Sequence, residues 1–307
     1  MRLGFNLPQI GPAASAKALV QVAQRAEELG YDSLWVTERL LFPIEPRTPY
    51  MATPDGSLPD AYKIVFDPIE TLTYVAAHTS KIALGTSVID IPYYNPVMLA
   101  RRLTTLDVLS GGRLRLGMGQ GWSEDEHEAA GASLKGRGKR ADEFISVLKA
   151  IWTTDPVEFK GEFYTVPKSI IQPKPIQQPH PPIYLAAYAP SALKRVATMA
   201  DGWLPAGLPA DAMKQMIDGL RAMAKEAGRD PAEIAIIVRA NIEVRDEPRA
   251  EDGFIFTGTP DQIKADIAET RDLGVAELHF DPSVSPDGAT VEGFLSRMEQ
   301  MKELAGA

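Results

Sequence analysis

The chain contains no cysteine and only four histidines in 307 residues. The absence of cysteine excludes disulfide bonds, thiol nucleophiles and thiolate metal sites. No two of the histidines have the sequence spacing of a pair of metal ligands. The four histidines are His78, His127, His180 and His279. We therefore expect neither a metal centre nor a cysteine-based active site.

The sequence also lacks long apolar runs and a net positive charge. No segment approaches the length of a signal or transmembrane helix, so we expect a cytosolic protein. The formal net charge of −9 disfavours nucleic acid and anionic membrane surfaces as partners. The hydrophobic share of 45% is ordinary for a globular protein, so disorder is not indicated.

Short apolar runs alternate with amphipathic stretches along the whole chain. Ser15 and Gly30 bracket the first amphipathic stretch as N-cap and C-cap residues, and the next strand follows within two residues. Eight such alternations predict a (β/α)8 TIM barrel with parallel connections, in a single domain spanning residues 1–307. A doubly wound sheet is the alternative. We expect strands at 3–7, 33–37, 81–85, 113–116, 183–186, 202–204, 234–238 and 277–280, and helices at 15–29, 68–79, 96–109, 139–152, 191–199, 210–227, 260–273 and 291–304.

Two irregular insertions break this rhythm. Residues 40–66 follow strand 2, and residues 153–182 come after the helix that follows strand 4. Long insertions in a compact domain are usually lids or binding loops. We expect the first to cover the face at the carboxyl ends of the strands. The second is either a lid or a structural strap around the barrel.

Glycines alternate at the exit of the fourth expected strand. Gly117, Gly119 and Gly121 leave one face of this segment without side chains, so a flat ring could lie against its backbone. The spacing differs from the dinucleotide fingerprint. Structural glycines at a strand bend explain the pattern equally well.

Charged residues directly follow strand 2. Glu38 and Arg39 would lie at the active face of a barrel, although Arg39 could instead pair with a carboxylate to hold the loop. The acidic run 124–128 offers further candidate bases. We favour a solvated first helical turn there, stabilised by the helix dipole.

Two segments suit anionic groups. Small residues at 186–189 precede a helix start, where exposed amides favour phosphate, although Ser191 could simply be the N-cap. A basic cluster at 135–140 could hold an anionic tail, but a solvated helix start is the simpler interpretation. Its members are Lys135, Arg137, Lys139 and Arg140. Asn95 and Pro96 suit the N-cap and first position of another helix.

Several motifs between residue 1 and about residue 205 together resemble the bacterial luciferase-like monooxygenase superfamily. They are SLWVTER, IALGTSV, YNPVMLARRLTTLDVLSGGRLRLGMGQGW, PKPIQQPHPPIYLAA and ADGW. Within it the sequence is most similar to the coenzyme F420-dependent oxidoreductases. The resemblance implies a TIM barrel that binds its cofactor at the carboxyl ends of the strands.

The resemblance also implies roles for particular residues. A non-prolyl cis peptide at Ser87–Val88 would support the cofactor ring, and Glu38 matches an acidic position of the deazaflavin enzymes. The remaining residues implied to bind the cofactor are Gly117, Gly119, Gly121 and Trp122, together with Ala186, Ala187, Tyr188 and Ala189 of the phosphate loop.

Two positions depart from the family pattern. Arg39 stands where relatives have histidine, and Trp122 stands where the sugar-phosphate dehydrogenases have a catalytic glutamate. Sugar-phosphate oxidation is therefore disfavoured. Glu38 becomes the first candidate for the catalytic acid or base. Arg39 is a further candidate catalytic residue, and Asp125 or Glu126 ranks after Glu38 as the acid or base.

These observations support three functions. The first is hydride transfer between coenzyme F420 and a small organic substrate bound over the deazaflavin ring. The second is an FMN-dependent two-component monooxygenase, whose partner would be a flavin reductase, and the third is a cofactor-binding protein without turnover. The family resemblance further implies a homodimer formed through barrel helices.

Overall fold

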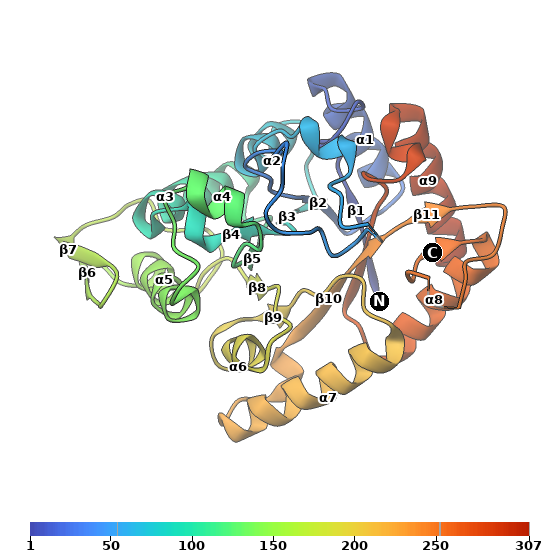
Figure 1. The fold of residues 1–307 in the computed structure, drawn as a ribbon. Coiled ribbons are helices and arrows are strands. Elements are labelled where there is room, and N and C mark those ends of the chain that lie inside the picture. Colours follow the sequence, from blue (N-terminus) through green and yellow to red (C-terminus); the bar gives the residue numbers. More distant parts are fainter. Residues whose placement is uncertain (54, 252, 307) are drawn as a thin grey trace.

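The barrel predicted from the sequence is confirmed. The computed structural model describes residues 1–53, 55–251 and 253–306 (Figure 1). Parallel strands pair in the order β3-β2-β1-β13-β10-β9-β8-β5, and pairing of β3 with β5 closes the barrel. These strands are β1 (Arg2–Asn6), β2 (Ser33–Val36), β3 (Ala83–Thr86), β5 (Leu114–Gly119), β8 (Ile183–Leu185), β9 (Gly202–Trp203), β10 (Ala235–Asn241) and β13 (Glu277–Asp281).

Helices surround the barrel, as Figure 1 shows. They are α1 (Ala16–Glu28), α2 (Pro68–Ala76), α3 (Pro96–Ser110), α4 (Glu124–Ala129), α5 (Arg137–Thr153), α6 (Pro190–Met199), α7 (Ala210–Glu226), α8 (Pro260–Asp272) and α9 (Val291–Leu304). The predicted caps hold: the side chain of Ser15 accepts from the Ala18 amide at the start of α1, and Asn95 caps α3 with Pro96 in its first turn. At the end of α3, Gly111 adopts a left-handed conformation with φ of 73°, which favours glycine.

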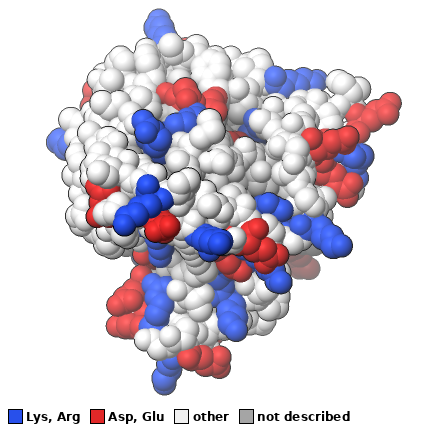
Figure 2. All heavy atoms as spheres, turned by 90° about the vertical axis from the view of Figure 1, so that its left-hand side faces the viewer, with Lys and Arg blue, Asp and Glu red and all other residues white. Residues whose placement is uncertain are grey.

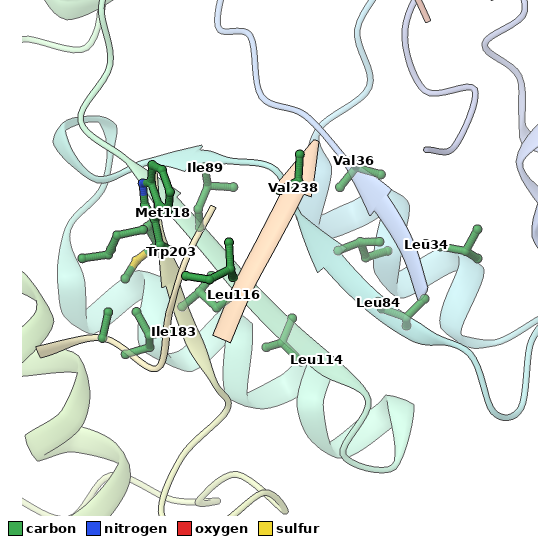
Figure 3. Close-up of a cluster of buried hydrophobic side chains, with 14 of the residues drawn as sticks. Leu34, Val36, Leu84, Ile89, Leu114, Leu116, Met118, Ile183, Trp203 and Val238 are labelled. Carbon is green, nitrogen blue, oxygen red and sulfur yellow. The ribbon is translucent and has the colours of Figure 1, made fainter. Parts of the chain in front are cut away.

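Most of the hydrophobic core lies between the barrel and its helices. Alternate residues of the strands, such as Leu34, Leu84 and Leu116, are fully buried and belong to one large apolar cluster with helix residues. Figure 3 shows part of this cluster, drawn from several neighbouring strands. Successive side chains of a strand point to opposite faces. The residues that adjoin each of these leucines along its own strand therefore point into the barrel.

The inside of the barrel holds buried polar side chains beside a small apolar cluster that includes Trp35 and Ile237. Glu277 from β13 accepts the indole N–H of Trp35 from β2 at 3.1 Å and forms an ion pair with Arg115 from β5. Higher in the barrel, the ring of His279 stacks on Trp35 with 4.7 Å between centroids, and its Nδ1 lies 2.9 Å from Asn6 Oδ1. Burial, followed by the nearby charge of Arg239, holds the pKa of His279 well below its usual range.

The first insertion covers the carboxyl ends of the strands, as predicted. Its end pairs with the segment after β1 through an Ile10–Val65 bridge, and Gln9 donates to the Phe66 carbonyl at 2.8 Å. Its middle is held by α4, where the amide of Glu124 donates to Thr48 Oγ1 at 3.1 Å. Residues 40–66 are called the lid loop below.

The second insertion is a strap. Gln177 Nε2 donates to Asp107 Oδ1 at 2.7 Å and to the Leu114 carbonyl at 2.8 Å, which places residues 176–182 against the amino end of β5. An antiparallel hairpin of β6 (Val157–Lys160) and β7 (Thr165–Ser169) precedes it, beside α5 at the left edge of Figure 1. The lid alternative for this segment is therefore excluded.

Predicted element bounds differ from the structure at a few ends. Strand β5 continues to Gly119 because the short strand β4 (Ile89–Asp90) pairs with Met118 and Gly119. Helix α2 ends at Ala76, three residues before its predicted end, in a tighter turn where the His78 amide donates to the Val75 carbonyl. A further small parallel pair, β11 (Glu243–Val244) and β12 (Thr257–Gly258), lies outside the barrel and was not predicted.

Charge is dispersed over the surface. On the face shown in Figure 2, basic and acidic side chains are interspersed, and no broad basic field is seen there. None of the helices in the described part of the chain has the length and apolar character needed to cross a membrane. The same residues hold no group of three or more His, Cys, Asp or Glu side chains suited to a metal ion.

Candidate active site

The predicted cis peptide bond lies where β3 ends. The Ser87–Val88 bond is cis, and the Val88 carbonyl accepts the Glu38 amide at 3.2 Å. The Ser87 carbonyl accepts from Thr37 Oγ1 at 3.1 Å and from Arg239 Nη1 at 2.9 Å. This segment is thereby tied to the ends of two other strands.

Glu38 lies beside this bulge and is buried. The Tyr94 hydroxyl donates to Glu38 Oε1, and the Asp90 amide donates to Oε2 at 2.6 Å. Burial first, and then the charge of Asp90, raises the pKa of Glu38 to about 8. Glu38 is therefore a protonated carboxylic acid at neutral pH and can give up a proton.

Asp90 is the second carboxyl of the site and is half-buried. Its Oδ1 accepts the Gly121 amide at 2.8 Å, which fixes the exit of β5. Burial raises the pKa of Asp90 to about 6, and this amide bond opposes the shift. Asp90 is not among the site residues expected from the sequence. Asp90 belongs to the short strand β4, which the sequence did not predict, so its place in the site was not foreseen.

The three alternating glycines have different surroundings. A Cβ on Gly117 would lie 2.0 Å from the Thr86 carbonyl oxygen, so this glycine allows β3 and β5 to approach each other. A Cβ on Gly119 would lie 2.7 Å from Val88 Cγ2, directly beside the bulge, while Gly121 has a φ of 63°. Of the three, Gly119 adjoins the bulge most directly, and Gly117 serves strand packing.

Arg39 is enclosed above Glu38 in the lid region. Its Nη1 lies 3.3 Å from Glu126 Oε2, and both side chains are almost fully buried. The guanidinium carbon lies 4.8 Å from the Trp122 ring centroid and 5.5 Å from that of Tyr62. The expected alternative, an Arg39–carboxylate pair that holds the loop, is therefore present.

The interpretation of the acidic run as a solvated helical turn is wrong for its central members. Glu126 is buried, and its Oε1 accepts the Leu40 amide at 2.7 Å. Asp125 accepts Arg47 Nε at 2.8 Å, and Glu128 forms an ion pair with Arg47 at 2.5 Å. These carboxylates fasten the lid loop to α4, so Asp125 and Glu126 are positioned as anchors.

The expected phosphate loop forms a small pocket at the start of α6. Backbone of residues 186–187 lines it together with Gly119 and Gln120. Helix α6 begins after Ala189 with Pro190 and has no side-chain cap, so the N-cap role considered for Ser191 is excluded. The buried amide nitrogen of Gln120 lacks a hydrogen-bond partner among the described residues. The Ala186 amide already donates to the Met118 carbonyl, so the unpaired Gln120 donor is the feature of this pocket that suits a phosphate group.

Tyr188 points back toward the next strand. Its hydroxyl accepts the Ala206 amide at 2.9 Å and donates to the Ala206 carbonyl at 3.2 Å. Both hydrogen bonds fix the loop after β9 to the phosphate loop. Tyr188 therefore shapes this edge of the site.

The basic residues 135–140 do not form one cluster. Arg137 Nη1 donates to the Gly121 carbonyl at 2.8 Å, and Arg140 lies over the Phe163 ring at 4.6 Å. Lys135 and Lys139 are exposed. Only these two lysines remain in the solvated state expected for a helix start.

Arg239 and Asp281 form the floor of the site, and sequence reasoning missed both. Arg239 Nη2 pairs with Asp281 Oδ2 at 2.5 Å, and Nε donates to Asn241 Oδ1 at 3.0 Å. The available signal was an arginine inside the apolar stretch AIIVRAN, where only a buried partner makes the charge tolerable.

A closed parallel barrel with buried acids, a small pocket at a helix start and a lid at the carboxyl ends of its strands belongs to the class of (β/α)8-barrel enzymes. The family model described as luciferase-like monooxygenase matches residues 1–252, and the chain belongs to this family. The predicted family resemblance is thereby confirmed.

Known relatives include users of two different cofactors. An uncharacterized protein of Mycobacterium tuberculosis is 34% identical over 238 residues, which cover 76% of this chain and 81% of that protein. An FMNH(2)-dependent dimethylsulfone monooxygenase of Pseudomonas putida is 31% identical (75% and 79% covered). An F420-dependent glucose-6-phosphate dehydrogenase of Amycolatopsis mediterranei is 32% identical (66% and 57% covered).

A solved structure agrees with the fold over nearly the whole chain. The coenzyme F420-dependent tetrahydromethanopterin reductase of Methanopyrus kandleri superposes with a TM-score of 0.76 at 18% identity and covers 97% of each chain. The family and these relatives identify the chain as an enzyme of the oxidoreductase and monooxygenase kind.

Proposed function

We propose that this protein transfers hydride between coenzyme F420 and a small organic substrate. The observation that carries the proposal is Glu38, a buried carboxyl that keeps its proton up to about pH 8 beside the Ser87–Val88 bulge. Hydride addition to an unsaturated group leaves negative charge that a nearby acid can neutralise. The F420-dependent relative supports the same cofactor.

The residues present fit the coenzyme in two places. Gly119 and Val88 would adjoin the flat ring, and the pocket formed by Gln120 and residues 186–187 would hold its phosphate. When bound, F420 supplies or accepts the hydride. Glu38 holds the exchangeable proton at its carboxyl, Arg239 orients the Ser87 carbonyl, and the lid loop excludes water.

The test is turnover by the F420-loaded enzyme with a panel of alcohols, ketones and enones, followed by deazaflavin absorbance. For any active compound, we expect E38Q to lose about 100-fold or more in kcat, the usual range for removal of a general acid. Retention of full activity by E38Q would contradict the role given to Glu38.

The FMN-dependent monooxygenase is the second candidate, and the similarity to the dimethylsulfone enzyme supports it. The ring and phosphate positions above suit either flavin. In that case a flavin reductase would be the partner that supplies reduced FMN. Oxygen consumption by the FMNH2-loaded protein in the presence of substrate would favour this function over the first.

We also propose that the protein forms a homodimer through α2 and α3. These adjacent helices expose large apolar side chains, with Tyr74 at 41%, Met98 at 68% and Leu109 at 64% exposure. Light scattering should therefore give twice the chain mass of 33.4 kDa. A particle with the mass of one chain would contradict the proposal.

A further inference from the structure

The guanidinium of Arg39 has one edge without a hydrogen-bond partner. Nη1 faces Glu126, whereas Nε and Nη2 are buried and find no partner among the described residues. The side chain as a whole is only 6% exposed. The N–H bonds of Nε and Nη2 run parallel on the same edge, which is the fork that matches both oxygens of a carboxylate.

Neighbouring side chains hold this edge in place. The rings of Trp122 and Tyr62 lie over the guanidinium, and Tyr50 packs against Trp122 with 5.5 Å between centroids. The hydroxyls of Tyr50 and Tyr62 lie 3.1 Å apart, so the three rings form one connected wall. Cation–π contacts stabilise the charge of Arg39, but they do not provide acceptors for its N–H groups.

Glu126 does not pair with the Nε–Nη2 edge of Arg39. Glu126 faces Nη1 with Oε2, and its Oε1 is occupied by the Leu40 amide. Asp90 is close enough for its charge to act on Arg39, but its Oδ1 accepts the Gly121 amide. Unpaired buried donors cost free energy, which a planar acceptor with two oxygens would recover.

We propose that the Nε–Nη2 edge of Arg39 binds a carboxylate group of the substrate. The fork reads a carboxylate in preference to a neutral amide because both oxygens accept, whereas an amide offers one acceptor and one donor. Arg39 is then a specificity-determining residue, and the substrates are organic acids. Identification of the ligand as the substrate rests on the proposed function.

Acetate is the probe, because it carries a carboxylate and only one methyl group. Nitrogen-15 spectra of the arginine Nε–H groups report the edge directly, and the Arg39 signal is identified by its loss in R39K or by correlation along the side chain. We expect a saturable shift of this signal with acetate and a response at least tenfold weaker with isosteric acetamide. Exposed Arg101 on α3 serves as the internal control.

Two results would overturn the assignment: equal responses to acetate and acetamide, or a shift with acetate that does not saturate and is shared by Arg101. F420 binding is measured on the same sample by fluorescence. Loss of F420 binding with an intact acetate response would remove the proposed function and leave the carboxylate site. Tight F420 binding without an acetate response would remove the carboxylate site and leave the proposed function.

Discussion

Glu38, Tyr94 and Asp90 illustrate how burial creates chemistry at single residues. Glu38 accepts two hydrogen bonds, yet its pKa rises because desolvation of the charge outweighs them. The same burial raises the pKa of Tyr94 far above its usual value, so this hydroxyl keeps its proton throughout the physiological range. The group that exchanges a proton near neutral pH is therefore the carboxyl.

The raised pKa of Glu38 predicts a pH-dependent stability difference between wild type and E38Q. The folded pKa of about 8 exceeds the usual glutamate pKa of 4.5, so the wild type loses stability as pH rises between these values. The slope is about 1.4 kcal/mol per pH unit, and glutamine does not titrate. Denaturation of both proteins from about pH 5 to about pH 9 should show E38Q gaining relative stability up to about pH 8. A difference that is constant with pH would contradict the assignment.

Gly117 is expected to be intolerant of any side chain. G117A places a methyl group 2.0 Å from a backbone oxygen of β3, which cannot turn away. We expect a loss of about 3 kcal/mol or more in the free energy of unfolding. The matched control is G219A in α7, where a Cβ meets nothing within 4 Å and the change should stabilise by about 1 kcal/mol. Urea denaturation gives both values, and near-equal stability of the two variants would refute this account of Gly117.

The lid loop is the element that couples the site to its surroundings. Hydrogen bonds and ion pairs from α4 fasten its middle, and the Ile10–Val65 bridge fastens its end. Exposed ion pairs contribute little to global stability but can limit local opening. This distinction makes the fastening testable by local rather than global measurements.

R47A should loosen the lid loop without unfolding the barrel. The substitution removes the contacts of Arg47 with Asp125 and Glu128. We expect a global stability change within about 1 kcal/mol, because exposed pairs contribute little. Amide hydrogen exchange at residues 40–66 should be several-fold faster. K214A, which breaks the exposed Lys214–Asp218 pair on α7, is the control and should leave that exchange unchanged. Equal exchange in R47A and wild type would contradict the fastening role.

Elements with a clear period could be predicted from the sequence, and contacts between distant segments could not. The helix α9 was predicted with its observed bounds, because its apolar spacing is regular and local. In contrast, Asp107 anchors the strap to Gln177 across 70 residues, which no local pattern encodes. The sequence therefore left residues 153–182 as either a lid or a strap. The hydrogen bonds at the amino end of β5 show that they form a strap.

The candidate site shows the same difference between local sequence patterns, which could be predicted, and contacts between distant residues, which could not. Glu38 and Arg39 were found because charges directly after an apolar strand mark the active face of a barrel. Their environments depend on Tyr94 and Glu126, which lie far along the chain and become neighbours only when the barrel closes. Arg239 stayed hidden because its partner Asp281 belongs to another strand.

At the scale of the whole molecule, the apolar residues that stabilise the fold and the polar residues of the candidate site lie in different places. The large apolar cluster lies outside the barrel, whereas the polar interior rises from Glu277 to Arg239 at the open ends of the strands. The pocket at the start of α6, the bulge and Glu38 all lie at that end. One cofactor bound there would contact elements from both halves of the chain.

The most direct test of the central claim is a parallel titration of the purified protein with F420 and with FMN, each followed by ring fluorescence. We predict saturable binding of F420 at micromolar or lower concentration and binding of FMN at least tenfold weaker. A preference for FMN would contradict the F420 assignment and favour the monooxygenase, and binding of neither would refute a cofactor site at this face.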